Sequence, residues 1–271
     1  MTADKKTYFL SDVHLGAAYH KKNADKLASA AHKSKESKDN PLYIDHEVER
    51  KLCRWFDMVK ADAATIYLLG DIFDYWFEYK NVVPRGFTRV LGKIAELTDM
   101  GIEIHFFIGN HDIWLTDYLR DECGMIIHKQ PLIVDIDGKR FFLAHGDGLG
   151  DESRSFKIIR RIFHSEILRV PFAAVHPRWT VGFAHAWSKH SRDTGEMLDY
   201  LGEKNEHLII YAKEHSKKNP DINFYIFGHR HILLDLELRD QCRVVVLGDW
   251  INYFSYGVLD NGRFTLEIFE E

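Results

Sequence analysis

The sequence predicts an α/β protein that folds as a single domain over residues 1–271. Continuous apolar runs such as Thr65–Leu69 are typical of strands that are covered on both faces. Segments with apolar residues at helical spacing alternate with these runs in the first half of the chain. A chain of 271 residues, 45% of them hydrophobic, is also long enough to bury a large core.

The first half is expected to alternate strands with helices, an order that favours βαβ units. Apolar residues three or four positions apart predict a helix over Asp45–Ala61, and a second helix is marked by the apolar positions between 90 and 97. Residues 20–40 are rich in Lys, Ser, Ala and Asp and are expected to form a loop. Strands are predicted at Thr7–Leu10, Thr65–Leu69 and Ile102–Ile108.

The second half is expected to begin and end with hairpins, with a helical segment between them. Asp137-Gly138 and Asn261-Gly262 are dipeptides that two-residue hairpin turns favour. Residues 153–213 are expected to be helical and to form an insertion that covers the functional site as a lid. Strands are predicted at Leu132–Asp135, Arg140–Ala144, Asn223–Phe227, Leu233–Leu238 and Val244–Leu247.

Composition and charge exclude several classes of protein. The net charge of −5 gives no protein-wide positive field, so nucleic acid is not an expected partner. Three widely spaced cysteines without a CxxC pair argue against a disulfide framework or a cysteine zinc site, and they fit a reducing cytoplasm. Neither a signal peptide nor a run of about 18 apolar residues is visible, so a cytoplasmic location is predicted.

Five short polar motifs each follow a predicted strand. Ligands of open α/β sheets bind beyond the carboxyl ends of strands, so the motifs are expected to meet in one crevice if their strands share a sheet. Residues i and i+2 of an extended segment point the same way, so each of the two pairs spaced in this manner is expected to bind one ion. The motifs are Asp12-Val13-His14, Gly70-Asp71, Gly109-Asn110-His111-Asp112, His145-Gly146-Asp147 and Gly228-His229-Arg230-His231.

The donors in these motifs are carboxylate oxygens, an amide oxygen and imidazole nitrogens. This set suits Mn, Fe, Co or Zn better than the all-oxygen shell of Mg or Ca. Each motif alone has an ordinary structural explanation, since Gly-Asp is common in turns and Asn-His-Asp can cap a helix. Their joint occurrence at five strand ends, with chemically compatible side chains, favours a metal centre.

In this order the motifs resemble the signature of the calcineurin-like metallophosphoesterases, from residue 7 to about residue 258. The resemblance implies a four-layer α/β/β/α sandwich and two divalent metal ions, with Mn²⁺ expected first and Fe or Zn as alternatives. Two such ions generate a hydroxide from water and neutralise phosphoryl oxygens. Asp71, which bridges the ions, and His111, which lies beside the reacting phosphoryl group, would be the catalytic residues. The implied ligands are Asp12, His14, Asp71 and His231 for one ion, and Asp71, Asn110, His145 and His229 for the other.

A narrower likeness is to the UDP-2,3-diacylglucosamine diphosphatases of lipid A synthesis. It is carried by LSDVHLG, LLGDIFDYW, GHRH and LGDW, together with the helical insertion after His145-Gly146-Asp147. It implies a UDP-linked glycolipid substrate, cut at its pyrophosphate to UMP and 2,3-diacylglucosamine 1-phosphate. Typical members of this branch carry Arg after the Asn, whereas this chain has His111, as the broader family does.

Residues 153–192 form a basic segment with eight basic residues and one acidic residue, interleaved with large apolar side chains. A basic amphipathic helix of this kind binds anionic lipid surfaces, so a peripheral position on the inner membrane is predicted. The alternative is that its apolar face packs on the core while Lys and Arg reach into water. The candidate substrate-binding residues are Asn110, His111, Arg160, Arg161, Ser191 and Arg230.

Three residues beside the ligands have two interpretations each. Asp112 and Asp147 are expected either to orient ligand imidazoles or to cap helices. Arg230, between two ligands, is expected either to bind a phosphate or to pair with a neighbouring carboxylate.

Two other functions compete with the glycolipid hydrolase. The first is another metallophosphoesterase, such as a nucleotide phosphodiesterase or nuclease, in which the basic segment holds phosphates and Trp179 and Trp187 stack on bases. The second is a non-catalytic binding scaffold, which the complete set of candidate ligands disfavours.

Overall fold

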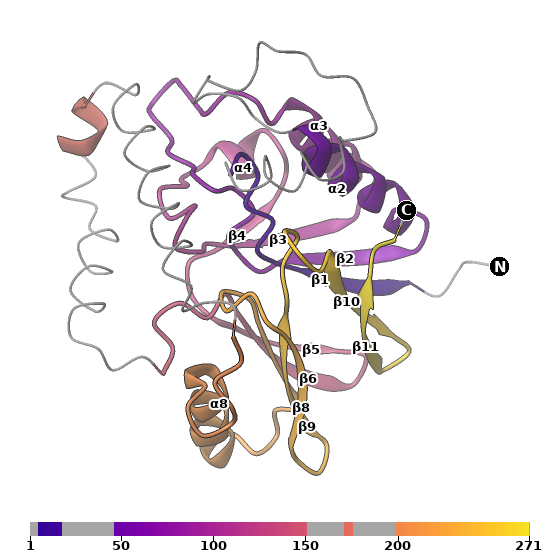
Figure 1. The fold of residues 1–271 in the computed structure, drawn as a ribbon. Coiled ribbons are helices and arrows are strands. Elements are labelled where there is room, and N and C mark those ends of the chain that lie inside the picture. The colour runs from indigo at the N-terminus through magenta and orange to yellow at the C-terminus, as the bar shows by residue number, and fades with distance from the viewer. Residues whose placement is uncertain (1–4, 18–45, 151–170, 176–198, 271) are drawn as a thin grey trace, which may run out of the picture.

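A computed structural model of the chain describes residues 5–17, 46–150, 171–175 and 199–270. Two β-sheets pack face to face, and helices cover the outer face of each sheet (Figure 1). The expected four-layer α/β/β/α arrangement is confirmed.

The first sheet has six strands in the order β11-β10-β1-β2-β3-β4. β1 to β4 are parallel, as the expected βαβ units require, while β10 pairs antiparallel with both β1 and β11. The sequence did not predict β4, because three residues are too short to show a period. The strands are β1 (Lys6–Leu10), β2 (Ala63–Leu68), β3 (Glu103–Phe107), β4 (Ile126–His128), β10 (Ser255–Asp260) and β11 (Arg263–Ile268).

The second sheet has five strands in the order β5-β6-β7-β9-β8. Its three central strands are parallel, and the two edge strands run antiparallel to them. Asp137-Gly138 forms the predicted turn between the first two. The strands are β5 (Leu132–Ile136), β6 (Lys139–Ala144), β7 (Phe224–Phe227), β8 (Leu233–Arg239) and β9 (Cys242–Leu247).

The helices lie on the two outer faces. α2 (His46–Val59) and α3 (Thr88–Asp99) cover the first sheet, and α8 (His207–Lys218) covers the second (Figure 1). A single helical turn, α4 (Tyr118–Asp121), precedes β4 and was not predicted. No helix in these described parts of the chain is long and apolar enough to cross a membrane.

Side-chain alternation along the strands divides the buried residues into three cores. On β1, Phe9 points between the sheets while Tyr8 and Leu10 point toward α2 and α3. On β7, Ile226 points between the sheets while Phe227 points toward α8. Every central strand is therefore buried on both faces, which explains why these strands appear in the sequence as continuous apolar runs.

The predicted helical insertion at 153–213 lies mostly outside the described residues, including Arg160, Arg161 and Ser191. Where the structure describes it, the prediction is partly wrong. Residues 199–206 form no helix, and the helix that follows runs on to Lys218. Residues 171–174 are helical, and Phe172 packs on Trp114 and Phe77 with ring centroids 4.5 Å and 5.2 Å apart.

Candidate metal centre

The five polar motifs lie beyond the carboxyl ends of β1, β2 and β3 in the first sheet and of β6 and β7 in the second. They therefore meet between two sheets and not at the edge of one. Two backbone N–H groups of the second sheet's loops donate to Asp12 here: that of His229 to Oδ2 over 2.9 Å, and that of Trp250 to the carbonyl over 3.0 Å. The loop after β1 is thus held by the loops that follow β7 and β9 in the second sheet.

The backbone at the candidate ligands adopts the left-handed region. Among the described residues, nine that are not glycine have positive φ, and five of these are candidate ligands. The expectation that Asp12-x-His14 and His229-x-His231 are extended is therefore wrong. Positive φ is uncommon in residues other than glycine, although Asp and His adopt it more often than most, and such conformations cluster at functional sites. The five are Asp12 (53°), His14 (49°), Asp71 (53°), His229 (68°) and His231 (53°).

Three glycines in the motifs leave room for the ligands. A Cβ at Gly70 would lie 2.6 Å from His145 Nδ1, and one at Gly228 would lie 2.5 Å from Asp12 Oδ2. A Cβ at Gly109 would overlap Asp71 Oδ1 and lie 2.6 Å from the Asp71 nitrogen. At these three positions the backbone approaches the ligand side chains too closely for any residue with a Cβ.

All seven candidate ligands come together, and six of them form two groups linked through Asp71. A further group of possible ligand atoms consists of His14, Asp74 and His111. Asp12, His14 and His231 form one group of ligand atoms within 4.8 Å of one another, and Asp71, His145 and His229 form another. Asp71 Oδ2 lies 3.4 Å from His145 Nε2 and 3.8 Å from His14 Nε2, between the groups. Asn110 Oδ1 joins the second group at 3.2 Å from His145 Nε2. This is the division that the family resemblance implies. It separates His229 from His231, so the expectation that these two residues bind one ion together is wrong.

Three of the ligand imidazoles are oriented through Nδ1 by acceptors outside the ligand set. The Nδ1–H of His145 donates to the Leu69 carbonyl over 2.8 Å, and that of His231 to Asp249 Oδ2 over 3.1 Å. His14 Nδ1 lies 3.4 Å from Asp74 Oδ1. A proton on Nδ1 leaves the lone pair of a neutral ring on Nε2, and in all three rings Nε2 faces the ligand carboxylates.

The donor set fits a pair of divalent cations. Asp12 Oδ1 and His229 Nδ1 are buried and take part in no hydrogen bond with any residue that the structure describes. Buried polar atoms are almost always satisfied, so each has the environment of a ligand atom. Carboxylate oxygen, amide oxygen and imidazole nitrogen together suit first-row transition metals.

Charges in the centre keep its carboxylates ionised. Burial raises the pKa of Asp71, but the imidazoles of His145 and His111 outweigh it, so that the pKa lies well below its usual value. The same balance, with His231 as the main opposing charge, lowers the pKa of Asp12. Both carboxylates are therefore anionic at neutral pH and can act as ligands.

His111 lies beside the ligands and outside both groups. Its Nδ1 lies 3.0 Å from the Asp74 carbonyl, which can only accept, so Nδ1 carries a proton. Its Nε2 lies 3.9 Å from Asp71 Oδ2, and its ring meets the His14 ring edge-on at 4.6 Å. A role for His111 beside a reacting phosphoryl group stays a prediction.

Arg230 pairs with a carboxylate, one of the two alternatives that its sequence position left open. Its Nε lies 2.7 Å from Glu206 Oε1, its Nη2 donates to the Asp199 carbonyl over 3.1 Å, and both charged side chains are buried. A role for Arg230 in substrate binding stays a prediction.

Asp112 does not orient an imidazole. Its two oxygens accept the N–H groups of Gly109 and Ile72 at 2.7 Å and 3.1 Å, so it ties the loop after β3 to the loop after β2. Burial, aided by Asp71, raises its pKa to about 7. Asp147 is buried nearby, and its charge acts on both His145 and His229.

Sequence reasoning missed Asp74, Asp249 and Glu206, which hold His14, His231 and Arg230. Asp249 had a usable signal, because it follows a buried strand, β9, as the ligands follow theirs. Asp74 and Glu206 had none, since neither stands next to a strand end.

Comparison with known proteins identifies the family of this chain. The family model described as calcineurin-like phosphoesterase matches residues 5–233. A protein of Porphyromonas gingivalis named UDP-2,3-diacylglucosamine hydrolase is 47% identical over 98% of both chains. One of the same name from Edwardsiella ictaluri is 28% identical over 72% of this chain and 75% of its own. Among solved structures, the E. coli phosphoesterase Yfce covers 94% of this chain and is itself covered to 88%, with 17% identity and a TM-score of 0.41.

Proposed function

The chain belongs to the calcineurin-like phosphoesterase family, a family of metal-dependent hydrolases, and from this premise we propose that it cleaves the pyrophosphate of UDP-2,3-diacylglucosamine. The products are UMP and 2,3-diacylglucosamine 1-phosphate. The observation that carries this substrate is the 47% identity, over nearly the whole of both chains, to the relative of that name. The centre is compatible with it, because its ligands suit a phosphoryl group between two cations.

The proposed metals are two divalent ions, Mn²⁺ first, with Fe or Zn as alternatives. Asp12, His14 and His231 would hold one ion, Asn110, His145 and His229 the other, and Asp71 both. When bound, the ions supply a hydroxide nucleophile and offset the charge on the phosphoryl oxygens.

The protein's own groups orient the reaction. Leu69, Asp74 and Asp249 hold ligand imidazoles so that their Nε2 atoms face the centre. The Asp74 carbonyl fixes the His111 ring by Nδ1, which leaves Nε2 directed at the site. In its doubly protonated form, His111 can donate from Nε2 to the leaving phosphate oxygen.

An aromatic cluster that begins three residues after His111 in the sequence is compatible with a lipid substrate. Trp114 lies three residues beyond His111, and with Phe77 it forms the surface on which Phe172 packs. Acyl chains would lie against such aromatic rings. Membrane binding by residues 153–192, with contacts from Arg160, Arg161 and Ser191, is part of the proposal and rests on the sequence alone.

Incubation with UDP-2,3-diacylglucosamine and Mn²⁺ tests the substrate, with release of UMP as the expected result. An aryl phosphodiester serves as the comparison substrate, and His111→Ala as the catalytic control. Efficient cleavage of the diester without UMP release would remove the glycolipid and leave a phosphodiesterase. Chelation followed by return of Mn²⁺, Fe²⁺ or Zn²⁺ separates the candidate metals.

A further inference from the structure

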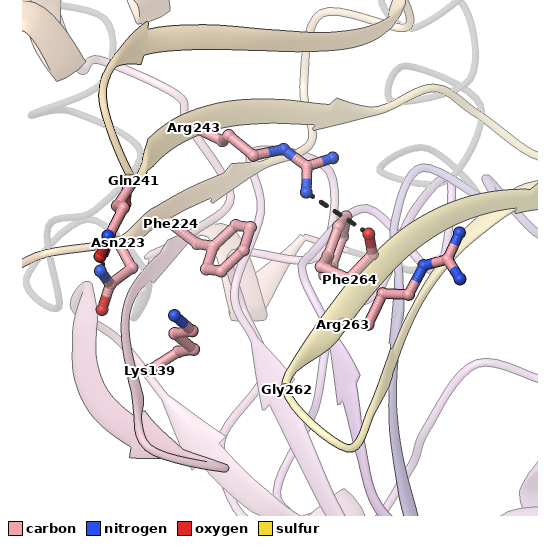
Figure 2. A pocket seen from close by; sticks show the side chains of 8 residues that line it. All are labelled: Lys139, Asn223, Phe224, Gln241, Arg243, Gly262, Arg263 and Phe264. Carbon is pink, nitrogen blue, oxygen red and sulfur yellow. Dashed lines mark hydrogen bonds between the residues drawn. The ribbon is translucent and has the colours of Figure 1, made fainter.

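A second pocket lies at the opposite edge of the sheets from the metal centre. It has a volume of about 380 Å³ and opens where β6, β9 and β11 begin (Figure 2). Phe224, which lines it, precedes His229 by five residues along the chain, so at about 3.3 Å per strand residue the two ends are roughly 17 Å apart. The pocket is therefore separate from the centre.

The charge of this pocket is entirely positive. Lys139, Arg243 and Arg263 line it, and no acidic side chain does, in a protein whose net charge is −5. Neither Lys139 nor Arg263 forms an ion pair with any other residue in the described ranges. Two uncompensated cations at the mouth of a concave surface concentrate anions there.

Arg243 is fixed in position by its surroundings. Its Nε and Nη2 pair with Asp235, with Nε 2.9 Å from Oδ1, and its Nη1 lies 3.4 Å from the Phe264 carbonyl. The guanidinium also lies over the rings of Phe224 and Phe264, 5.4 Å and 5.7 Å from their centroids. Asp235 occupies one edge of the guanidinium, while Nη1 donates one N–H to the Phe264 carbonyl and has a second N–H left for a ligand (Figure 2). An oriented guanidinium of this kind suits a phosphate oxygen.

Two hairpin turns form the wall of the pocket. A Cβ at Gly262 would lie 3.6 Å from the Asp137 carbonyl, so the β10–β11 turn is adjacent to the β5–β6 turn. Figure 2 shows Lys139 and Arg243 on opposite sides of the Phe224 ring, while Arg263 extends along β11 at the rim. The cations thus come from three strands of two sheets, which the packing of the sheets holds at fixed separations.

We propose that this pocket binds a small phosphate ester. A dianionic phosphate would be held between Lys139 and Nη1 of Arg243, with the positive charge of Arg263 at the rim adding to the attraction. The volume exceeds what inorganic phosphate needs and lies within the range of sites for small organic ligands, so an esterified phosphate is the better fit. This inference is independent of the reaction at the metal centre.

Backbone amide NMR of the Zn²⁺-loaded, diamagnetic protein tests the proposal with inorganic phosphate and with UMP as probes. Saturable shifts are expected at Lys139, Gln241 and Gly262, separate from any at the metal loops, and tighter for UMP than for inorganic phosphate. Removing two of the cations, as Lys139→Ala with Arg263→Ala, should weaken binding at these amides by at least about tenfold.

Arg140→Ala is the matched control, because Arg140 is adjacent in sequence but points to the other face of β6, where it pairs with Asp221. It should leave phosphate affinity at the pocket unchanged. Shifts confined to the metal loops, shifts that grow linearly without saturation, or an equal loss in the control would each overturn the proposal. The urea unfolding midpoint of every variant separates lost binding from lost folding.

Discussion

The two ends of the parallel strands use the left-handed backbone region for different purposes. At the carboxyl ends, positive φ falls on Asp12, Asp71 and other candidate ligands, whose side chains converge on one another. At the opposite edge it falls on Asp137, Gln241 and Asn261, which form hairpin turns. A hairpin turn requires the left-handed backbone conformation but no particular side chain. At the centre, both the backbone conformation and the identity of the side chain are required. Substitutions of the same type at the two ends should therefore differ in kind.

Asp71→Ala and Asp137→Ala are expected to differ the most in their effects. They are a matched pair, because the two residues have nearly the same φ, 53° and 48°. Asp71→Ala should lower kcat/KM by more than about a thousandfold and reduce bound metal to half or less, because Asp71 lies between both ligand groups. Asp137→Ala should keep full activity and lose about 1 kcal/mol of stability. Turnover and metal analysis measure the first, and urea unfolding the second. Normal metal content in Asp71→Ala would refute the bridging position.

The buried Arg230–Glu206 pair and the partly exposed Arg243–Asp235 pair make the second contrast. Glu206→Ala should destabilise the protein by about 3–5 kcal/mol, because it leaves a buried guanidinium unpaired. Asp235→Ala should cost less than about 1 kcal/mol. Urea unfolding measures both variants. It should also show that the double variant Glu206→Ala/Arg230→Ala loses less stability than the sum of the losses in the two single variants. If Arg230 instead binds substrate, Arg230→Lys would raise KM at unchanged stability.

Gly109→Ala and Gly138→Ala make the third contrast. The added Cβ at Gly109 overlaps the Asp71 carboxylate, so metal affinity should fall by about tenfold or more. At Gly138 nothing lies within 4 Å, and only the positive φ of 71° opposes the substitution. Gly138→Ala should lower the free energy of unfolding by about 1 kcal/mol and leave the activity unchanged. Equal metal affinity in both variants would show that the loop after β3 adjusts freely.

The pKa values of His14, in the centre, and His128, outside it, are shifted in opposite directions, and the effect on stability is expected to be the smallest of the four contrasts. Burial lowers the pKa of His14, but Asp12 and Asp74 outweigh it and raise the pKa to about 10. For His128, at the end of β4, burial and the neighbouring His105 lower the pKa to about 4. Between about pH 4 and the usual value of 6.5, the unfolded chain binds the His128 proton more tightly than the folded protein, so this part of the stability is present at pH 7 and lost toward pH 4.

His128→Gln should therefore reduce the loss of stability between pH 7.5 and pH 5. Chemical unfolding of the wild-type protein and of His128→Gln at both pH values measures this loss. Protonation at the metal centre affects the two proteins equally, so it cancels when their losses are subtracted. An identical loss in both proteins would mean that His128 titrates normally in the folded state.

The secondary structure could be predicted where a pattern of apolar residues extends over several consecutive positions, or where a turn has a characteristic dipeptide. The central strands are buried on both faces, so their apolar runs marked them, and Asp137-Gly138 marked a turn. Elements as short as β4 and α4 carry too few residues for a period to show. The prediction of a helix over residues 199–206 was wrong. It considered only neighbours in the sequence, whereas Glu206 is held by Arg230, which lies in a loop distant in the sequence.

The sequence by itself determined which side chains lie at the carboxyl edge of a sheet, because a polar residue directly after a buried strand emerges there. Tertiary structure alone decided that the edges of two sheets face each other, that the ligands sit at positive φ, and that Asp74 and Asp249 orient imidazoles. These depend on distances between segments far apart in the chain, which only the packing of the two sheets across their shared core sets.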